Sequence, residues 1–549
     1  MVLEFTRQRI ALSLAGFALA LASHAAAAVT FTVTTTADKN DGVCDADCSL
    51  REAVIAANDI VGTDTISLPA GSFILSATLS DDDAAAVGDL DLTEDVVITA
   101  PPEAVIDGTA LEQIFGVEHG NTVTISGGRF LGRVVDFFGA AAVPGSLQLT
   151  GATVTLLAEV MTGDFEYAEA AQGVATAISN TAFAVALNEG TGSEVGFQIS
   201  GGEGIAVEVP GGSAGSLSLA SVALVGADVA ASLGSSVYEF NDTVGAVSET
   251  VTVGGATVGI DIASPSIRAL LTEGLFDVSG GSPIAASAAF EIVTTGVGEA
   301  IAASFFSGSL SFADGALEMG NLEATGILLA TGAFAMGGRG DLALLSASAT
   351  LSGAPARFEA NTSTAGVDQG FSTLGSTANV QVGPGPSQRV FLFGANIGAS
   401  GAPSVNGDLI FEETTVGGTA AAVVAFETAS LAMAGGEVIA ADLSGLGLID
   451  SAGGFAAVLS GTLGFAAADM TLPGTGTLAI NSGLHPLDET VSFEGATTRL
   501  TLPSGPLTQI IMPSASLGLN GSPLVGGDFL LSEIDLAGLP AVGMTIANG

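Results

Sequence analysis

The sequence has no tryptophan, two tyrosines, two cysteines and a single lysine, Lys39, among its 549 residues. Its 11 basic residues stand against 57 acidic ones, so the formal net charge is −46. A surface of this sign repels the phosphate backbone, which argues against nucleic acid as a partner. The shortage of Lys, Arg and Trp also argues against an enzyme that grips uronate chains. Only Tyr167 and Tyr238 supplement phenylalanine as platforms for sugar rings.

Charged residues are scarce as well, at 12%, while 48% of the residues are hydrophobic and 76 are glycine. A disordered chain would carry fewer apolar residues, so the composition predicts a folded protein that buries them. No Pro-rich hinge, charge block or helical heptad divides the chain. The composition therefore indicates one long, repetitive architecture, with the acidic side chains keeping its surface soluble.

The first 28 residues have the pattern of a secretory signal peptide. Arg7 and Arg9 precede an apolar run over residues 10–22, and Ala25–Ala28 offers A-x-A cleavage sites. We expect cleavage after Ala28, so that the mature chain begins at Val29. The apolar run is too short for a membrane span, and later uncharged stretches such as residues 451–468 are interrupted by Gly, Ser and Thr. We predict an exported protein without a transmembrane span, either secreted or displayed on the cell surface.

Short alternating runs of apolar and polar residues, closed by Gly, Ser, Asn or Asp, dominate the chain after residue 120. Six of them are predicted strands: Thr122–Ser126, Ser146–Thr150, Ser216–Leu219, Glu249–Val253, Ser309–Phe312 and Arg499–Leu502. The first two begin 24 residues apart (146 − 122), which favours a solenoid over tandem sandwiches. We therefore predict an all-β fold, a right-handed parallel β-helix with a short N-terminal capping helix.

One segment near the N-terminus carries a specific motif. Cys44 and Cys48 are the only cysteines, and export would place them in an oxidising compartment, so we predict a disulfide between them. Ser49 and Glu52 have the S-x-x-E spacing of a helix capping box, which predicts a helix that continues to about Asn58. Its apolar stripe is suited to cover the first coil of a solenoid. That stripe consists of Leu50, Ala53, Val54 and Ala57.

The run Cys48-Ser49-Leu50-Arg51-Glu52-Ala53 resembles the CSLREA domain, and several later segments follow that family's order. These are Ala56–Asn58, Asp64–Gly71, Gly88–Leu92 and Ile106–Gly108. The resemblance covers residues 30–125 and implies an N-terminal module of exported bacterial proteins that leads into a parallel β-helix. It implies three parts: the signal peptide over 1–28, a CSLREA-type cap with first coils over 29–125, and a β-helix body over 126–549. Such a resemblance specifies architecture and export better than activity.

Two acidic clusters match the hard oxygen ligands that calcium prefers, although neither has the register of an EF-hand. We take calcium as the candidate cofactor and solvated loop acids as the alternative. The first cluster is Asp38, Asp41, Asp45 and Asp47; the second is Asp81, Asp82, Asp83, Asp89 and Asp91.

Nothing in the sequence assembles a convincing catalytic set, and no catalytic residue is assigned. Arg339-Gly340-Asp341 is an RGD tripeptide that could lie on an exposed turn, with a chance occurrence as the alternative. We predict a secreted or cell-surface structural and adhesive protein without enzymatic activity, which contacts surface glycans, matrix or other cells. The alternative function is a carbohydrate-active β-helix enzyme, a polysaccharide lyase or glycoside hydrolase, which requires a groove lined by two or more carboxylates.

Overall fold

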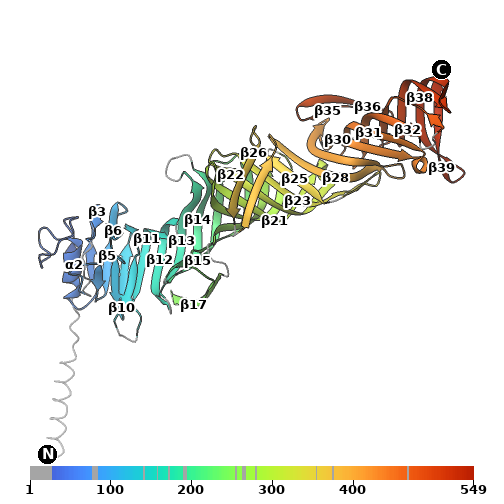
Figure 1. The fold of residues 1–549 in the computed structure, drawn as a ribbon. Helices are drawn as coiled ribbons and strands as arrows, with labels where there is room; N and C mark the ends of the chain where they lie inside the picture. The colour runs from blue at the N-terminus through green and yellow to red at the C-terminus, as the bar shows by residue number, and fades with distance from the viewer. Residues whose placement is uncertain are drawn as a thin grey trace, which may run out of the picture. The chain divides into compact units, whose positions relative to one another are not determined.

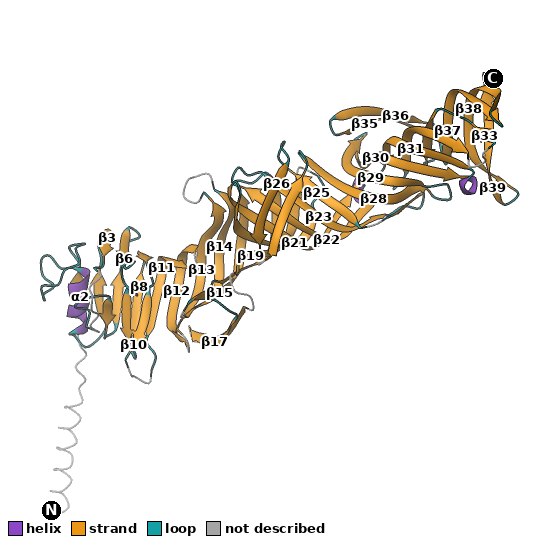
Figure 2. Ribbon diagram, in the orientation of Figure 1, coloured by secondary structure: helices purple, strands orange, loops and turns teal. Residues whose placement is uncertain are grey.

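The computed structural model describes residues 28–549 except 77–83, 140–142, 158, 171–172, 189–193, 210, 254–255, 263–266, 279–280, 354, 374–375 and 466–468. Strands account for nearly all of the described secondary structure, which confirms the all-β class (Figures 1 and 2). None of the helices in these residues has the length and apolarity needed to cross a membrane. All of the predicted signal peptide except Ala28 lies outside the described residues.

The chain forms two compact units, which are described separately. The first comprises residues up to Phe183 together with Ser200–Ala220 and Glu239–Ile267; the second comprises Ala184–Ile199, Ser221–Tyr238 and Arg268–Gly549.

The first unit begins with one helix and ten short strands. They are β1 (Thr30–Thr32), α2 (Leu50–Asn58), β2 (Asp64–Ser67), β3 (Gly71–Ile74), β4 (Leu90–Leu92), β5 (Val96–Thr99), β6 (Ala104–Asp107), β7 (Phe115–Glu118), β8 (Thr122–Ser126), β9 (Arg129–Leu131) and β10 (Val135–Phe138). All described pairings among these strands are parallel. They form three ladders, β1–β2–β5–β8, β3–β6–β9 and β4–β7–β10.

Aliphatic side chains stack in register along these ladders. Ile66, Ile98 and Ile125 are successive register partners in the first ladder and are fully buried. Each buried side chain of this size contributes about 1.5 to 3 kcal/mol relative to an exposed one. Without a covering element, the N-terminal end of this stack of strands would expose unpaired backbone groups and apolar side chains to solvent. Helix α2 lies against β1, β2 and β4 and covers them, as predicted.

Strand β11 (Ser146–Leu156) is where the mode of pairing changes. Its first half pairs with β8 in parallel, with Ser146 opposite Thr122, so the predicted interval of 24 residues is one step of the ladder. On its other edge β11 pairs antiparallel with β12 (Glu159–Ala170). A β-bulge with Gly151 in the left-handed region lies at the middle of β11.

From β12 onward all described pairs are antiparallel, so the parallel coils expected over residues 126–549 do not continue past β11. Many strands here have 11 to 15 residues. They are β13 (Gly173–Leu187), β14 (Val195–Val209), β15 (Gly212–Val225), β16 (Val229–Asn241), β17 (Val247–Val253), β18 (Ala256–Ile262), β19 (Ile267–Val278), β20 (Ile284–Thr295), β21 (Gly298–Phe312), β22 (Leu317–Leu329), β23 (Phe334–Leu344), β24 (Ala349–Ser352), β25 (Ala356–Asn361), β26 (Val367–Thr373), β27 (Ser376–Val382), β28 (Ser387–Ala399), β29 (Val405–Val416), β30 (Thr419–Met433), β31 (Val438–Ile449), β32 (Phe455–Phe465), β33 (Met470–Thr471), β34 (Thr475–Asn481), β35 (Leu487–Phe493), β36 (Ala496–Leu502), β37 (Leu507–Leu519), β38 (Ser522–Leu536) and β39 (Leu539–Ala547), with 3-10 turns at Ala313–Gly315 and Ala434–Gly436.

The strand order repeats at an interval of 120 residues. Three hairpins, β17–β18, β26–β27 and β35–β36, begin at Val247, Val367 and Leu487, and 367 − 247 and 487 − 367 are both 120. The strands that follow them, β19, β28 and β37, keep the same interval, beginning at residues 267, 387 and 507. The body therefore contains successive copies of one structural unit, which we call the 120-residue repeat.

In each repeat the hairpin folds over one face of the longer strands. Val367, Phe371 and Val380 of β26–β27 pack against Val293 and Ile327 of the sheet, all of them buried. The hairpin β17–β18 covers β13–β15, and β35–β36 covers β30 and β31, through equivalent clusters. Each repeat thus closes its own hydrophobic core.

A buried asparagine precedes each of the three covering hairpins, β17–β18, β26–β27 and β35–β36. Asn361 accepts a hydrogen bond from the Ser363 amide (2.8 Å) and donates to the carbonyls of Ala365 and Gly383 (2.8 Å each), so it joins the two ends of the hairpin. Asn481, 120 residues later, makes the same three kinds of bond. Asn241, 120 residues earlier, makes the two bonds within its own turn.

Replacing Asn361 with Ala should loosen one hairpin and leave its equivalent intact. The change leaves one amide and two carbonyls without partners at a site that is 1% exposed, which costs about 2 to 4 kcal/mol. Hydrogen exchange should quicken over residues 367–382 and stay unchanged over residues 487–502, the matched hairpin of the same molecule. Asn379→Ala, which removes an exposed amide, is the control variant. Equal exchange in wild type and Asn361→Ala would contradict this role.

Candidate functional sites

The predicted motif near the N-terminus is assembled as a structural clamp. The Cys44–Cys48 disulfide is present, with the two Cα atoms 4.4 Å apart. The capping box is confirmed: the Glu52 amide donates to Ser49 Oγ (3.1 Å) and the Ser49 amide donates to Glu52 Oε2 (2.8 Å). Leu50 is buried with the rest of the apolar stripe. These contacts fix the start of α2 and the loop that feeds it.

Arg51 has a role that the capping motif alone does not reveal. Its guanidinium uses all five donors: Nε and Nη2 bond to Asp38, Nη1 to the carbonyls of Ala85 and Asp89, and Nη2 also to the Gly88 carbonyl. The side chain is buried, and the distances run from 2.6 to 3.2 Å. Arg51 therefore ties α2 to the acidic loop on one side and to residues 85–89 on the other.

The only lysine neutralises the acidic loop. Lys39 Nζ lies 2.7 Å from Asp47, 3.1 Å from Asp41 and 3.4 Å from Glu52. Its hydrogen bond with Asp47 raises the pKa of Lys39, and the same bond lowers the pKa of Asp47. The ammonium group thus lies within 3.4 Å of three carboxylates.

The remaining described acids proposed as calcium ligands are bonded to other groups of the protein. Asp38 pairs with Arg51, and Asp45 accepts the Asp47 amide. Asp89 Oδ2 accepts from Gln113, and Asp91 Oδ2 accepts from the Ala85 amide. Within the described residues no three acidic, His or Cys side chains gather as a metal-binding group. Asp81, Asp82 and Asp83 lie outside the described residues.

Replacing Arg51 with Lys should destabilise the cap strongly. One ammonium cannot supply five donors in a planar fork, so buried carbonyls and the Asp38 carboxylate lose their partners, at a cost of about 3 to 5 kcal/mol. Thermal unfolding of the first unit, followed by hydrogen exchange over α2, is the measurement. Arg129→Lys, at a position on the exposed side of β9, is the matched control. An unchanged protection of α2 in Arg51→Lys would contradict the clamp.

Glu52 should make the cap sensitive to acid. Burial alone would raise its pKa, but hydrogen bonds from the amides of Ser49 and Asp41 and the ion pair with Lys39 hold the pKa below the ordinary 4.5. A lowered folded pKa means that its stabilisation is present above pH 4.5 and is lost as the pH falls below that value. The melting temperature of Glu52→Gln should therefore approach that of wild type towards low pH, whereas exposed Glu112→Gln should show no such convergence. Parallel curves for wild type and Glu52→Gln would refute the assignment.

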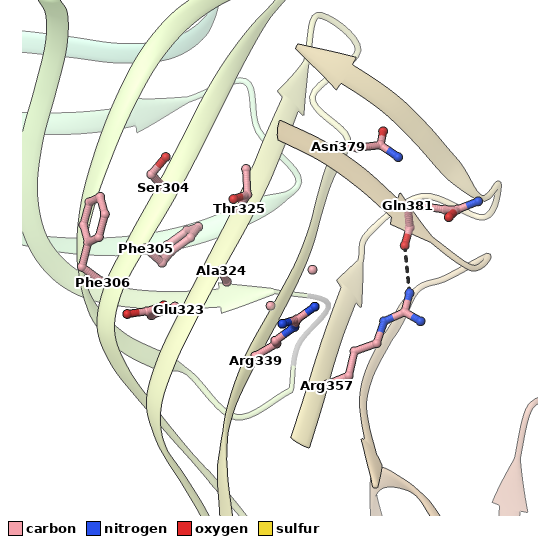
Figure 3. A pocket seen from close by; sticks show the side chains of 12 residues that line it. Ser304, Phe305, Phe306, Glu323, Ala324, Thr325, Arg339, Arg357, Asn379 and Gln381 are labelled. Atoms are coloured by element: carbon pink, nitrogen blue, oxygen red, sulfur yellow. Dashed lines mark hydrogen bonds between the residues drawn. The ribbon is translucent and has the colours of Figure 1, made fainter. Parts of the chain in front are cut away.

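A polar groove of about 830 Å³ lies in the second unit, and Figure 3 shows its lining. Strands β21, β22, β23 and β25 form its base, and β27 of the covering hairpin forms one side (Figure 3). Gly338 leaves no room for a side chain there, since a Cβ would approach Ala324 and the Glu323 carbonyl to 2.5 Å. The polar and aromatic side chains that line it are Ser304, Phe306, Glu323, Thr325, Arg339, Arg357, Asn379 and Gln381, and we call this set the arginine groove.

Two arginines face each other across neighbouring strands in this groove. Arg339 is the register partner of Arg357, and Glu323 is the register partner of Arg339. Arg357 is ion-paired with Glu359, donates to the Gln381 carbonyl (3.3 Å) and lies 5.8 Å from the centre of the Phe391 ring. Arg339 is exposed and forms no ion pair within the described part of the chain. Glu323, in register with Arg339, and Glu359, ion-paired with Arg357, place one acidic side chain beside each arginine.

The same row in the next repeat is neutral. Ser444, Ser460 and Thr477 are successive register partners on β31, β32 and β34, the equivalents of β22, β23 and β25. They stand where Glu323, Arg339 and Arg357 stand one repeat earlier. The fold of the repeat therefore does not require the arginine pair.

The RGD tripeptide is not on a turn. Arg339, Gly340 and Asp341 lie within β23, and Asp341 accepts a hydrogen bond from Asn321 (2.9 Å). The expected exposed turn is wrong, because the flanking glycines are accommodated in the strand. Sequence reasoning singled out Arg339 for this tripeptide and missed its pairing with Arg357.

A second groove, of about 500 Å³, lies in the first unit and holds two carboxylates. Arg133 Nε is 3.1 Å from Glu208 and its Nη1 is 3.6 Å from Asp136. Burial raises the pKa of Glu208, and the charge of Asp136 raises it further, whereas Arg133 opposes both effects. The carboxylates of Asp136 and Glu208 thus share one guanidinium, and one of them resists ionisation.

Comparisons of the chain with protein-family models, with curated proteins and with solved structures find no match.

Proposed function

We propose that the chain is an exported structural and adhesive protein that contacts glycans, matrix or other cells and catalyses no reaction. The observation that carries the proposal is the 120-residue repeat, in which each copy closes its own core under its own hairpin. Serial copies of a self-contained unit extend a surface without building a single active cleft. The acidic composition suits a chain that stays soluble outside the cell.

We further propose that the three parallel ladders of residues 30–150 wind as a right-handed parallel β-helix behind a CSLREA-type cap. The stacked Ile66, Ile98 and Ile125 and the position of α2 over the first strands support this arrangement. The Cys44–Cys48 disulfide suits an oxidising compartment and so supports export. In this proposal the cap shields the end of the ladders, while binding belongs to the repeats.

A carbohydrate-active enzyme is the second candidate, and one observation favours it. Asp136 and Glu208 flank Arg133 in a groove, and glycoside hydrolysis uses a pair of carboxyl groups of which one has a raised pKa, as Glu208 has. Both carboxylates are held by the same arginine, however, which favours a structural ion-pair network.

One experiment separates the two functions. The full chain is applied to immobilised polysaccharides and to cells while the soluble fraction is assayed for new reducing ends and unsaturated sugars. We expect saturable binding with no release of products. Product release that is abolished by Glu208→Gln and kept by Glu203→Gln, an exposed acid on the same strand, would establish the enzyme instead. Absence of binding to every surface by the folded chain would refute adhesion.

A further inference from the structure

We propose that the arginine groove binds a carboxylate-bearing sugar chain, with the carboxylate held between Arg339 and Arg357. The inference rests on the proposed adhesive function and names its site and ligand class.

The first support is electrostatic. A chain with 11 basic and 57 acidic residues places two of its arginines in direct cross-strand register, and one of them has no ion-pair partner among the described residues. A ligand carboxylate between them would accept charge-assisted hydrogen bonds from both guanidiniums.

The second support is the comparison of this repeat with the next repeat of the same chain. Where β22, β23 and β25 carry Glu323, Arg339 and Arg357, the next repeat carries Ser444, Ser460 and Thr477 in the same register. Because that repeat builds the same sheet without charges, packing does not explain the arginines. The charged row is thus a property of this repeat and not of the shared sheet, as expected for a binding site.

The third support is the chemistry of the remaining lining. Ser304 and Thr325, which carry hydroxyls, and Asn379 and Gln381, which carry amides, line the same groove as Arg339 (Figure 3). Phe306, 46% exposed, offers an apolar ring beside them. Hydroxyls and amides complement sugar hydroxyls, an aromatic ring complements the apolar face of a pyranose, and a guanidinium complements a carboxylate. A groove of about 830 Å³ accommodates more than one sugar ring.

The affinity should depend on salt and on the ligand's charge. The net charge of −46 repels anions at long range, so binding relies on short contacts in the groove. Each carboxylate contact to an arginine is a charge-assisted hydrogen bond, the class that contributes most per bond. Neutralising the sugar carboxylate should therefore remove most of the affinity.

The test measures binding of an oligogalacturonate to the full chain by calorimetry. The variant Arg339→Ser/Arg357→Thr installs the residues of the next repeat, so it should keep the fold, as checked by circular dichroism and melting temperature. We expect its affinity to fall by about tenfold or more. Arg499→Ser, which removes an exposed arginine paired with Asp488 elsewhere in the unit, should bind like wild type. The fully methyl-esterified oligomer should bind wild type as weakly as the acid oligomer binds the double variant.

The opposite results overturn the proposal in distinguishable ways. Unchanged affinity in a folded Arg339→Ser/Arg357→Thr refutes the groove as the site, and adhesion survives if the chain still binds glycans or cells. Equal binding of the methyl ester refutes the carboxylate contact. Tighter binding of polyglutamate than of oligogalacturonate would make the ligand an acidic peptide. If wild type binds none of the glycans or cells, the proposed function fails together with the inference.

Discussion

Backbone pairing along β11 is the constraint on which the arrangement of the first unit depends. A strand within a sheet must satisfy the amides and carbonyls on both of its edges, and β11 does so in two directions, parallel to β8 and antiparallel to β12. Two residues separate Leu156 of β11 from Glu159 of β12, and a tight turn between strands that pair with each other can join only antiparallel strands. Two residues also separate β8 from β9, but there the chain bends into a different parallel ladder and the two strands do not pair. The reversal after β11 ends the parallel ladder on that edge of the strand.

The positions of the strands and of the N-terminal cap could be predicted from the sequence, but the direction in which the strands pair could not. All six alternating runs lie in strands, and the helix, its capping box and the disulfide are where the residues predict them. Alternation, however, is the same in parallel and antiparallel strands, because it reports only that one face is buried. The interval between Thr122 and Ser146 is a true ladder step, and extending it to the whole chain was wrong.

The 120-residue repeat escaped sequence reasoning because its copies share geometry more than residues. Packing requires an apolar side chain of suitable size at a position and accepts several types, so Phe358 in one copy corresponds to Leu478 in the next. A turn whose backbone groups are bonded by one side chain is less permissive. Asn241, Asn361 and Asn481 therefore recur unchanged, since only an amide can accept from one amide and donate to the carbonyls at once. The 120-residue spacing of these three asparagines is visible in the sequence itself.

The same reasoning gives meaning to positions at which the copies differ. The copies of a repeat can be compared with one another. A feature that packing and strand pairing require is expected in each copy, whereas a feature found in one copy only calls for another explanation. The hairpin over the sheet, the asparagine turn and the buried apolar faces belong to the first class. The opposed Arg339 and Arg357 belong to the second, because Ser460 and Thr477 hold the same register without charge. Arg357 is ion-paired with Glu359, whereas Arg339 forms no ion pair among the described residues and is exposed to a ligand. The place where the repeat departs from its own pattern is therefore where a ligand is to be sought.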